Sequence, residues 1–250
     1  MKQEHYDPWA DETLLSDVID KFASQQSVWS RIHSRANFAF KRMLWRLVVG
    51  STHFFKTVLD VVAAFTGILL LSPIFLLTWI MIRIEDPGPA IFIQQRVGRY
   101  GKTFPMYKFR SMVMNADALK DELLQQNESS AGVIFKMKND PRITRVGAFI
   151  RKYSIDELPQ LFNVLFGHMS LVGPRPPVPR EVSEYSMSDR RRLDVKPGIT
   201  CLWQIGGRSD IDFAGQVRLD VQYIKEQSFW KDIVILFKTI PAVLLGKGAY

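Results

Sequence analysis

The feature that most constrains the fold is an uncharged apolar segment, residues 61–82, with the sequence VVAAFTGILLLSPIFLLTWIMI. Asp60 and Arg83 bracket this segment, and no charged residue interrupts it. Its length reaches the ~20 apolar residues that a helix needs to cross the hydrocarbon core of a bilayer. A buried core helix is the alternative interpretation, but such helices are usually shorter. The segment therefore predicts a protein that inserts into a membrane.

Ser72 and Pro73 stand in the middle of this segment and leave two topologies open. Proline removes a backbone donor and clashes with the preceding turn, so we expect a kink there. Each arm would have about 11 residues and a length of roughly 16 Å. Two arms at a sharp angle would enter about halfway and return to the same face of the bilayer. A kinked helix that spans the bilayer is the alternative, because spanning helices tolerate proline.

Basic residues on both sides of the segment favour a return to one face. In residues 21–60, before the segment, Asp60 is the one acidic residue against Lys21, Arg31, Arg35, Lys41, Arg42, Arg46 and Lys56. After it come Arg83, Arg96, Arg99, Lys102, Lys108 and Arg110. Cytoplasmic flanks of membrane segments are enriched in Lys and Arg. A re-entrant helix would also let Ser72 donate its hydroxyl to a carbonyl that the kink frees.

Two further stretches are typical of helices that lie in a headgroup layer, because they mix aromatic residues and Leu with Arg and Lys. One is residues 29–50, and the other is residues 229–246, in which Pro241 is expected to break the helix. An ordinary amphipathic helix on a protein core is the alternative for each. The net charge of +8 favours anionic partners. The single cysteine, Cys201, excludes an internal disulfide.

Residues 87–111 predict a β-hairpin, because two extended runs, AIFIQQRVG and TFPMYKFRS, flank the turn sequence RYGK. Lys108 and Arg110 alternate with Tyr107 and Phe109 in the second run. Side chains two residues apart on a strand share a face. These two cations are therefore predicted to lie together, where they could hold a phosphate or form ordinary surface charge.

Two helices are predicted after the hairpin. Residues 115–126, NADALKDELLQQ, have the composition of a polar helix. Asp140 and Pro141 then suit the N-cap and the first position of another helix, NDPRITRVGAFIRKY.

The sequence RKYSIDELPQLFN, residues 151–163, sets the adjacent carboxylates Asp156 and Glu157 close after Arg151. A helix start and Arg151 would both favour an ionised Asp156. An ionised aspartate can act as a nucleophile or as a Mg²⁺ ligand. A capped, solvated helix end is the alternative interpretation of this stretch.

The start of the helix in this stretch is open. Ser154 and Glu157 have the spacing of a capping box, which predicts a start at Ile155. Pro159 favours a start nearer Leu158. Gly167 is expected to end the helix. Farther on, prolines crowd residues 174–179 and hold Arg175 in an extended loop, which suits either phosphate recognition or a surface turn.

The order of these motifs resembles the bacterial sugar transferase family, the monotopic polyprenyl-phosphate phosphoglycosyl transferases. The resemblance lies in the apolar segment with its central Ser-Pro, in YKFRSM, in DPRITRVGAFIRKYSIDELPQLFNVLFGHMSLVGPRP and in KPGITCLWQIGGRSD. It covers about residues 54–250. It implies transfer of sugar-1-phosphate from a UDP-sugar donor to undecaprenyl phosphate, with release of UMP. It also implies two steps, a covalent phosphosugar–aspartate intermediate and a requirement for Mg²⁺.

The resemblance assigns a role to each candidate residue. It implies that Asp156 is the nucleophile, and that Asp156 and Glu157 are the catalytic acidic pair and the metal ligands. It favours the re-entrant topology, with the helix break at Ser72 and Pro73. The implied ligands of substrate phosphate and nucleotide are Lys108, Arg110, Arg151 and Arg175.

The resemblance also implies partners and a location. The C-terminal motifs are similar to those of members that transfer a hexose-1-phosphate, usually glucose or galactose, to start exopolysaccharide or capsule assembly. The expected location is the cytoplasmic face of the bacterial inner membrane, in contact with its lipids. No nucleic acid partner is expected, and a homo-oligomer is left open.

The predicted fold class is α+β and mostly helical, with a re-entrant membrane helix, interfacial amphipathic helices and a small β-hairpin. The predicted divisions are an N-terminal extension, residues 1–50, a membrane helix, residues 51–86, a catalytic core, residues 87–200, and a C-terminal extension, residues 201–250. One rival function is a non-catalytic membrane adaptor that binds anionic lipid. A soluble nucleic-acid-binding protein is a second rival, against which the uncharged segment argues. Neither rival explains the whole order of the motifs.

Overall fold

The computed structural model describes residues 16, 28–116, 118–119, 140–207 and 211–245. The chain divides into two compact units, Met1–His53 and Phe54–Tyr250. The second unit contains the apolar portion of the long helix described next, and all the described strands. The helix predicted over residues 115–126 lies largely outside the described residues.

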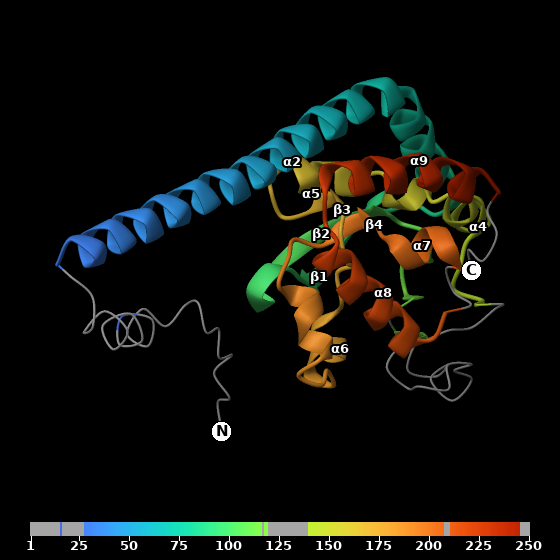
Figure 1. Cartoon of the computed structure of the whole chain (residues 1–250). Helices are drawn as coiled ribbons and strands as arrows, with labels where there is room; N and C mark the ends of the chain where they lie inside the picture. The colour runs from blue at the N-terminus through green and yellow to red at the C-terminus, as the bar shows by residue number, and fades with distance from the viewer. Residues whose placement is uncertain (1–15, 17–27, 117, 120–139, 208–210, 246–250) are drawn as a thin grey trace. The chain divides into compact units, whose positions relative to one another are not determined.

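The apolar segment forms part of a single long helix, α2 (Val28–Glu85), which bends in its blue-green part (Figure 1). Its portion Phe54–Glu85 is long and apolar enough to cross a membrane, and 11% of its most apolar stretch is buried. The hydroxyl of Ser72 donates to the carbonyl of Leu69 at 2.8 Å. Leu69 lies four residues before Pro73, so this is the carbonyl that proline leaves without its helical donor. The predicted use of Ser72 is confirmed.

The predicted hairpin is confirmed. Strand β1 (Ile91–Val97) pairs with β2 (Thr103–Phe109) in an antiparallel register that sets Ile91 opposite Phe109. The turn between them is a short 3-10 segment, η1 (Arg99–Gly101). The remaining elements are α4 (Arg145–Lys152), η3 (Ile155–Glu157), α5 (Gln160–Leu165), β3 (Ser170–Val172), α6 (Pro179–Ser183), η4 (Asp189–Leu193), β4 (Gly198–Thr200), α7 (Leu202–Gly206), α8 (Phe213–Lys225) and α9 (Phe229–Leu245).

The predicted N-cap at Asp140 is wrong. Helix α4 begins five residues later in the chain, and its N-cap is Thr144, whose side chain accepts a hydrogen bond from the backbone N–H of Gly147. The carboxylate of Asp140 instead accepts hydrogen bonds from the backbone and the guanidinium of Arg142. This local turn occupies the aspartate and delays the start of the helix.

The predicted capping box of Ser154 and Glu157 is also wrong. Ser154 adopts a left-handed conformation, with φ of 54°, and its side chain makes no capping hydrogen bond. The chain forms the short turn η3 and then begins α5, with Pro159 as its N-cap. The later of the two predicted starts is therefore the closer one. Gly167, with φ of 75°, follows the end of α5 as predicted.

The core contains a parallel strand pair that the sequence patterns do not predict. Strands β3 and β4 pair with Ser170 opposite Gly198. Around them pack side chains from β2, from α5 and from the C-terminal helices, and the largest buried ones are Phe104, Met106, Met169, Tyr223 and Ile235. Residues from both sides of position 200 therefore share one core.

The expected break of the last helix at Pro241 is wrong, because α9 continues through this proline to Leu245. Ile235 of α9 is buried in the core, and Thr239 contacts Thr200 of β4 through their hydroxyls at 2.8 Å. These contacts hold the helix one turn before the proline. Packing therefore outweighs the local cost of the proline, which is about 3 kcal/mol.

Polar contacts attach the start of the apolar portion of α2 to this core. The Lys56 ammonium lies 2.5 Å from one oxygen of Asp232 in α9. The Tyr223 hydroxyl donates to the other oxygen of Asp232 at 2.7 Å. One helical turn along α2, the buried carboxylate of Asp60 accepts from the backbone N–H of Leu171 in β3 at 3.1 Å. The base of the apolar helix is therefore fixed to β3 and α9.

Candidate active site

The structure brings the predicted acidic pair together with two of the predicted cations. Asp156 and Glu157 form η3, and Lys108 reaches them from β2. The Lys108 ammonium lies 2.8 Å from Oε1 of Glu157 and 3.9 Å from Oδ2 of Asp156. Arg175 donates to the same Oε1 of Glu157 at 3.1 Å. Two carboxylates and two cations thus form one compact charged cluster.

A fully buried side chain, Asn163, sets the position of this cluster. Its side-chain oxygen accepts from the backbone N–H of Tyr107 at 3.0 Å. Its side-chain nitrogen donates to the carbonyl of Pro105 at 2.6 Å. Because Asn163 lies in α5, directly after η3, these bonds hold the acidic pair beside Lys108. Asn163 was not among the predicted site residues. An amide among the apolar residues of a short helix is nevertheless a signal for hydrogen bonds to buried backbone groups.

Arg175 is positioned by the close approach of the segment after β3 to strand β4. The backbone N–H of Gly173 donates to the carbonyl of Thr200 at 3.0 Å, and that of Gly198 donates to the carbonyl of Pro174 at 2.9 Å. The extended proline-rich loop leaves the core at this point, as predicted. The end of the β3–β4 pair therefore fixes the residue that precedes Arg175.

Burial and charge affect the two carboxylates in opposite directions. Burial raises the pKa of Asp156 to about 6, although the charge of Lys108 opposes the shift. Burial also acts on Glu157, but there Lys108 and Arg175 together outweigh it and lower the pKa of Glu157 to about 2. The predicted effect of Arg151 is confirmed, because its charge favours the ionised form of Asp156, but burial has the larger effect on this pKa and opposes it. The charges of Lys108, Arg151 and Arg175 all favour the ionised form of Asp156.

The other predicted residues lie at different places. Arg110 follows the last residue of β2 and is bound to Asp86, through the Asp86 carbonyl and a carboxylate oxygen 3.6 Å away. Arg110 and Lys108 were expected to act together, but the structure gives them different partners. Arg151 is half-buried in the last turn of α4, and its charge favours the ionised form of Asp156. Ser72 and Pro73 lie inside α2, outside the charged cluster.

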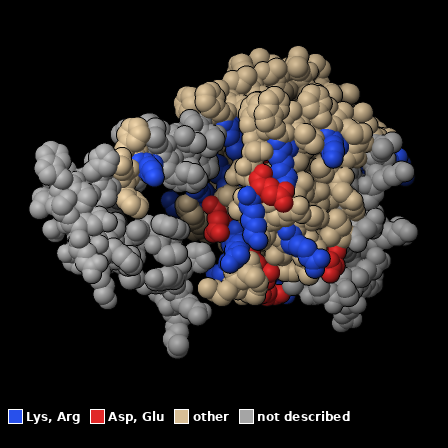
Figure 2. All heavy atoms as spheres, in the orientation of Figure 1, with Lys and Arg blue, Asp and Glu red and all other residues tan. Residues whose placement is uncertain are grey.

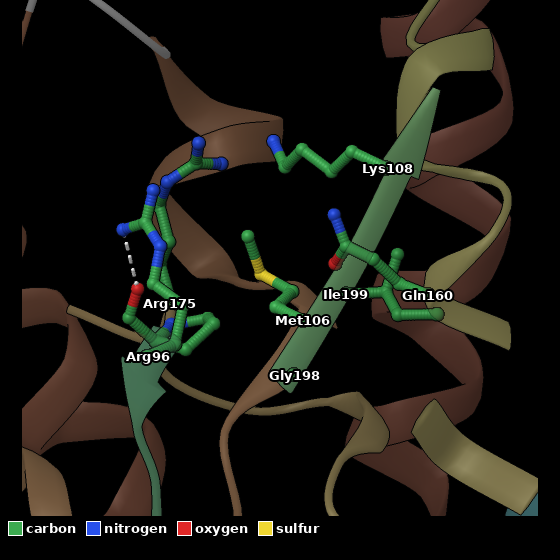
Figure 3. A pocket seen from close by; sticks show the side chains of 8 residues that line it. Arg96, Met106, Lys108, Gln160, Arg175, Gly198 and Ile199 are labelled. Carbon is green, nitrogen blue, oxygen red and sulfur yellow. Dashed lines mark hydrogen bonds between the residues drawn. The ribbon is translucent and has the colours of Figure 1, made fainter. Parts of the chain in front are cut away.

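A small pocket opens beside the cluster, between β1, β2, the proline-rich loop and β4 (Figure 3). It has a volume of about 190 Å³, which includes space open to solvent. Its lining residues are Arg96, Met106, Lys108, Gln160, Arg175, Pro176, Gly198 and Ile199. Arg96, which stands among the basic residues that flank the apolar segment in the sequence, is thus part of this pocket.

The cluster has a composition that suits Mg²⁺ bound together with substrate. Among the described residues, no group of three or more His, Cys, Asp or Glu side chains could hold a metal. The cluster offers two carboxylates, those of Asp156 and Glu157. Lys108 and Arg175 both contact Oε1 of Glu157, so neither of these contacts uses its other oxygen. Mg²⁺ is usually bound by one or two carboxylates, with substrate phosphates and waters as its other ligands. The pair fits this pattern.

Comparison of the sequence with known proteins identifies the family of the chain. The chain matches the family described as bacterial sugar transferase over residues 51–246. The chain belongs to the bacterial sugar transferase family. The matched range includes the apolar portion of α2, the acidic pair and all three C-terminal helices.

Three relatives illustrate the range of this family. The chain is 53% identical over 195 residues to the galactosyl transferase CpsE of Streptococcus agalactiae, covering 78% of this chain and 43% of that protein. It is 48% identical over 220 residues to the undecaprenyl-phosphate galactose phosphotransferase of Salmonella typhimurium, covering 85% and 46%. It is 43% identical over 198 residues to the exopolysaccharide production protein ExoY of Rhizobium meliloti, covering 78% and 88%. This sugar transferase thus spans less than half the length of the first two relatives and most of the third.

Proposed function

We propose that this sugar transferase moves sugar-1-phosphate from a UDP-sugar to undecaprenyl phosphate and releases UMP. The observation that supports this proposal most is the meeting of Asp156 and Glu157 with Lys108 and Arg175 in a partly buried cluster. Phosphoryl transfer depends on positioning and on neutralising charge, and this cluster supplies both. The name of the Salmonella relative describes the same class of transfer.

The reaction proceeds in two displacements at one phosphorus. In the first, a carboxylate oxygen of Asp156 attacks the β-phosphorus of the donor. The bond from that phosphorus to the bridging oxygen breaks, and its electron pair leaves with UMP. In the second, a phosphate oxygen of the lipid acceptor attacks the same phosphorus and expels the Asp156 carboxylate. The products are UMP, the sugar-diphosphate lipid and the regenerated enzyme.

Charged side chains hold the phosphates during both steps. Lys108 lies beside both carboxylates, so it is placed to contact the transferred phosphate. Arg175 is fixed by Glu157 and is placed to contact the nucleotide side of the donor. Mg²⁺ held by Asp156 and Glu157, when bound, neutralises phosphate charge.

The expected donors are UDP-glucose and UDP-galactose. The C-terminal motifs resemble those of hexose-1-phosphate transferases, and two of the relatives named above act on galactose according to their names. Purified protein with undecaprenyl phosphate and a panel of UDP-sugars should release UMP with one or both of these donors. Turnover with only N-acetylated or diacetamido donors would contradict this prediction.

The rival function, a lipid-binding adaptor without catalysis, has less support from the structure. Burying two carboxylates in one cluster is costly, and binding to anionic lipid requires no carboxylate. The same assay separates the two functions. An adaptor would release no UMP from any donor in the panel.

We also propose that the apolar portion of α2 is re-entrant and that both of its ends lie on the cytoplasmic face of the inner membrane. The bend of α2 (Figure 1), Pro73 inside this helix and the satisfied carbonyl of Leu69 support a helix that turns back. Figure 2 shows only uncharged residues where this bend lies, with Lys and Arg side chains below it, over α9. Such an arrangement suits an apolar bend in the hydrocarbon core and cations at the headgroups.

Cysteine labelling tests this topology. The native Cys201 is buried, so introduced cysteines should dominate the labelling. Cysteines introduced as Ser51→Cys and Pro89→Cys should both react with an impermeant maleimide only after the inner membrane is opened. Labelling of either one in intact spheroplasts would mean that the helix spans. Pro73→Ala should straighten the helix and increase spanning, whereas Pro241→Ala, the matched change in α9, should not.

A further inference from the structure

Arg96 is a half-buried cation beside the active site to which the proposed function assigns no part. It lies in β1, and its Nε and Nη2 both donate to the side-chain oxygen of Gln94, at 3.0 and 2.6 Å. Its Nη1 donates to the carbonyl of Pro176 at 2.9 Å. A guanidinium has five N–H donors, so these three bonds leave one N–H on each terminal nitrogen for another partner.

The guanidinium of Arg96 lies next to that of Arg175, and both groups gather with the Lys108 ammonium at one side of the pocket (Figure 3). Burial and the charge of Arg175 lower the pKa of Arg96 to about 10, although the charges of Glu181 and Glu157 oppose this shift. Like charges at such close range repel unless an anion lies between them. The pocket is therefore complementary to an anion.

The order of the charges indicates which anion. Asp156 lies beside Lys108, which contacts Glu157; Glu157 contacts Arg175, and Arg96 lies beyond Arg175. In phosphoryl transfer the attacking and leaving oxygens are roughly in line. If Asp156 attacks a phosphorus held by Lys108, the leaving oxygen lies on the far side, toward the two guanidiniums. That leaving oxygen belongs to a phosphate group, so a phosphate is the anion that the two guanidiniums would contact.

We propose that Arg96 and Arg175 together bind the phosphate that leaves with the nucleoside. This inference rests on the proposed function and adds Arg96 to its site. As Asp156 forms its bond to the β-phosphorus, the bond from phosphorus to the bridging oxygen breaks. The electron pair moves to that oxygen, which becomes part of the nucleoside monophosphate. The two guanidiniums offset the negative charge that develops there, and no proton transfer is needed.

This role predicts that Arg96 affects only the first half-reaction. Arg96→Gln keeps an N–H donor for the Pro176 carbonyl but removes the charge. It should slow formation of the covalent adduct from UDP-sugar by about 100-fold or more, since arginines that stabilise phosphoryl-transfer charge contribute ~10³–10⁵-fold. Arg96→Lys keeps the charge and should lie between Arg96→Gln and the unchanged protein. Arg99→Gln is the matched control, because Arg99 is an exposed cation of the same hairpin that contacts Asp194 and Tyr100.

The second half-reaction separates this role from a structural one. Each protein is loaded with adduct by long incubation, freed of donor and mixed with undecaprenyl phosphate. The unchanged protein and Arg96→Gln should then transfer their sugar-phosphate to the lipid at the same rate. Inhibition by UMP should weaken about tenfold or more in Arg96→Gln, whereas any inhibition by uridine should stay unchanged, because uridine lacks the phosphate.

Two results would overturn the inference. One is adduct formation by Arg96→Gln within threefold of the unchanged protein. The other is an equal slowing of both half-reactions, which would show that Arg96 only supports the fold. Failure of the unchanged protein to form an adduct with any UDP-sugar would instead overturn the proposed function itself.

Discussion

Asp156→Asn is expected to abolish turnover with every UDP-sugar, with a loss of about 10⁴-fold or more, as for the loss of other enzymatic nucleophiles. The amide keeps the shape of the carboxylate but loses its charge and most of its nucleophilicity. Because burial already disfavours the charged form of Asp156, the neutral amide should not lower the melting temperature of the protein. UMP release and thermal unfolding, measured on the same preparation, test both parts of this prediction.

The covalent adduct locates the nucleophile directly. With a UDP-sugar and Mg²⁺ but no acceptor, the unchanged protein should gain one sugar-phosphate, and mass spectrometry should place it on the peptide that contains Asp156. Asp156→Asn should gain none. Glu157→Gln should be severely impaired, because it loses the proposed metal ligand and the carboxylate that binds Lys108 and Arg175. Asp194→Asn changes an exposed carboxylate and serves as the control. An adduct on another peptide, or near-normal turnover by Asp156→Asn, would refute the assignment.

Gly198→Ala is expected to have a large effect on stability. A Cβ at Gly198 would lie 2.1 Å from the backbone nitrogen and 2.6 Å from the carbonyl oxygen of Gly173. Both neighbours are backbone atoms, so relief requires the β3–β4 pair to separate. Overpacking usually costs about 1–3 kcal/mol, and a clash with backbone belongs at or above the upper end. For a domain of this size, a loss of about 3 kcal/mol lowers the melting temperature by roughly 6–12 °C.

Gly206→Ala is the matched control for this substitution. Gly206 is the last residue of α7, and a Cβ there would meet nothing within 4 Å. Alanine should therefore be neutral or slightly stabilising at this position. Thermal unfolding in the same detergent compares the two variants. Equal melting temperatures for Gly198→Ala and the unchanged protein would show that the β3–β4 pair separates at this point without loss of stability.

Local patterns predicted the parts of the fold that local forces determine. The uncharged run predicted the apolar helix, and alternation around RYGK predicted the hairpin. Proline chemistry alone predicted that Ser72 would bind a freed carbonyl, because the affected atoms lie within one helical turn. The N-cap at Asp140 failed because Asp140 and Arg142 form a tighter local turn, and two competing local signals cannot be ranked without the fold.

Contacts between distant parts of the chain could not be predicted from the sequence patterns. Strands β3 and β4 have three residues each, too few for a periodic pattern, and their pairing depends on the close approach of Gly173 and Gly198. The resemblance indicated the acidic pair and its cations, but it did not reveal that burial governs the pKa of Asp156. Arg96 was missed because its neighbour in the pocket, Pro176, lies 80 residues along the chain.

The contact of Lys56 with Asp232 limits how far the chain can be shortened from its N-terminal side. Asp232 is 2% exposed, so its carboxylate depends on Lys56 and on the Tyr223 hydroxyl. A truncated fragment that starts after residue 60, made to obtain a water-soluble catalyst, would leave that charge without its counter-ion. Breaking a buried ion pair from one side costs about 3–5 kcal/mol, a large share of the stability of a typical domain. The start of the apolar helix is thus part of the folded core, and purification has to begin from protein that retains both.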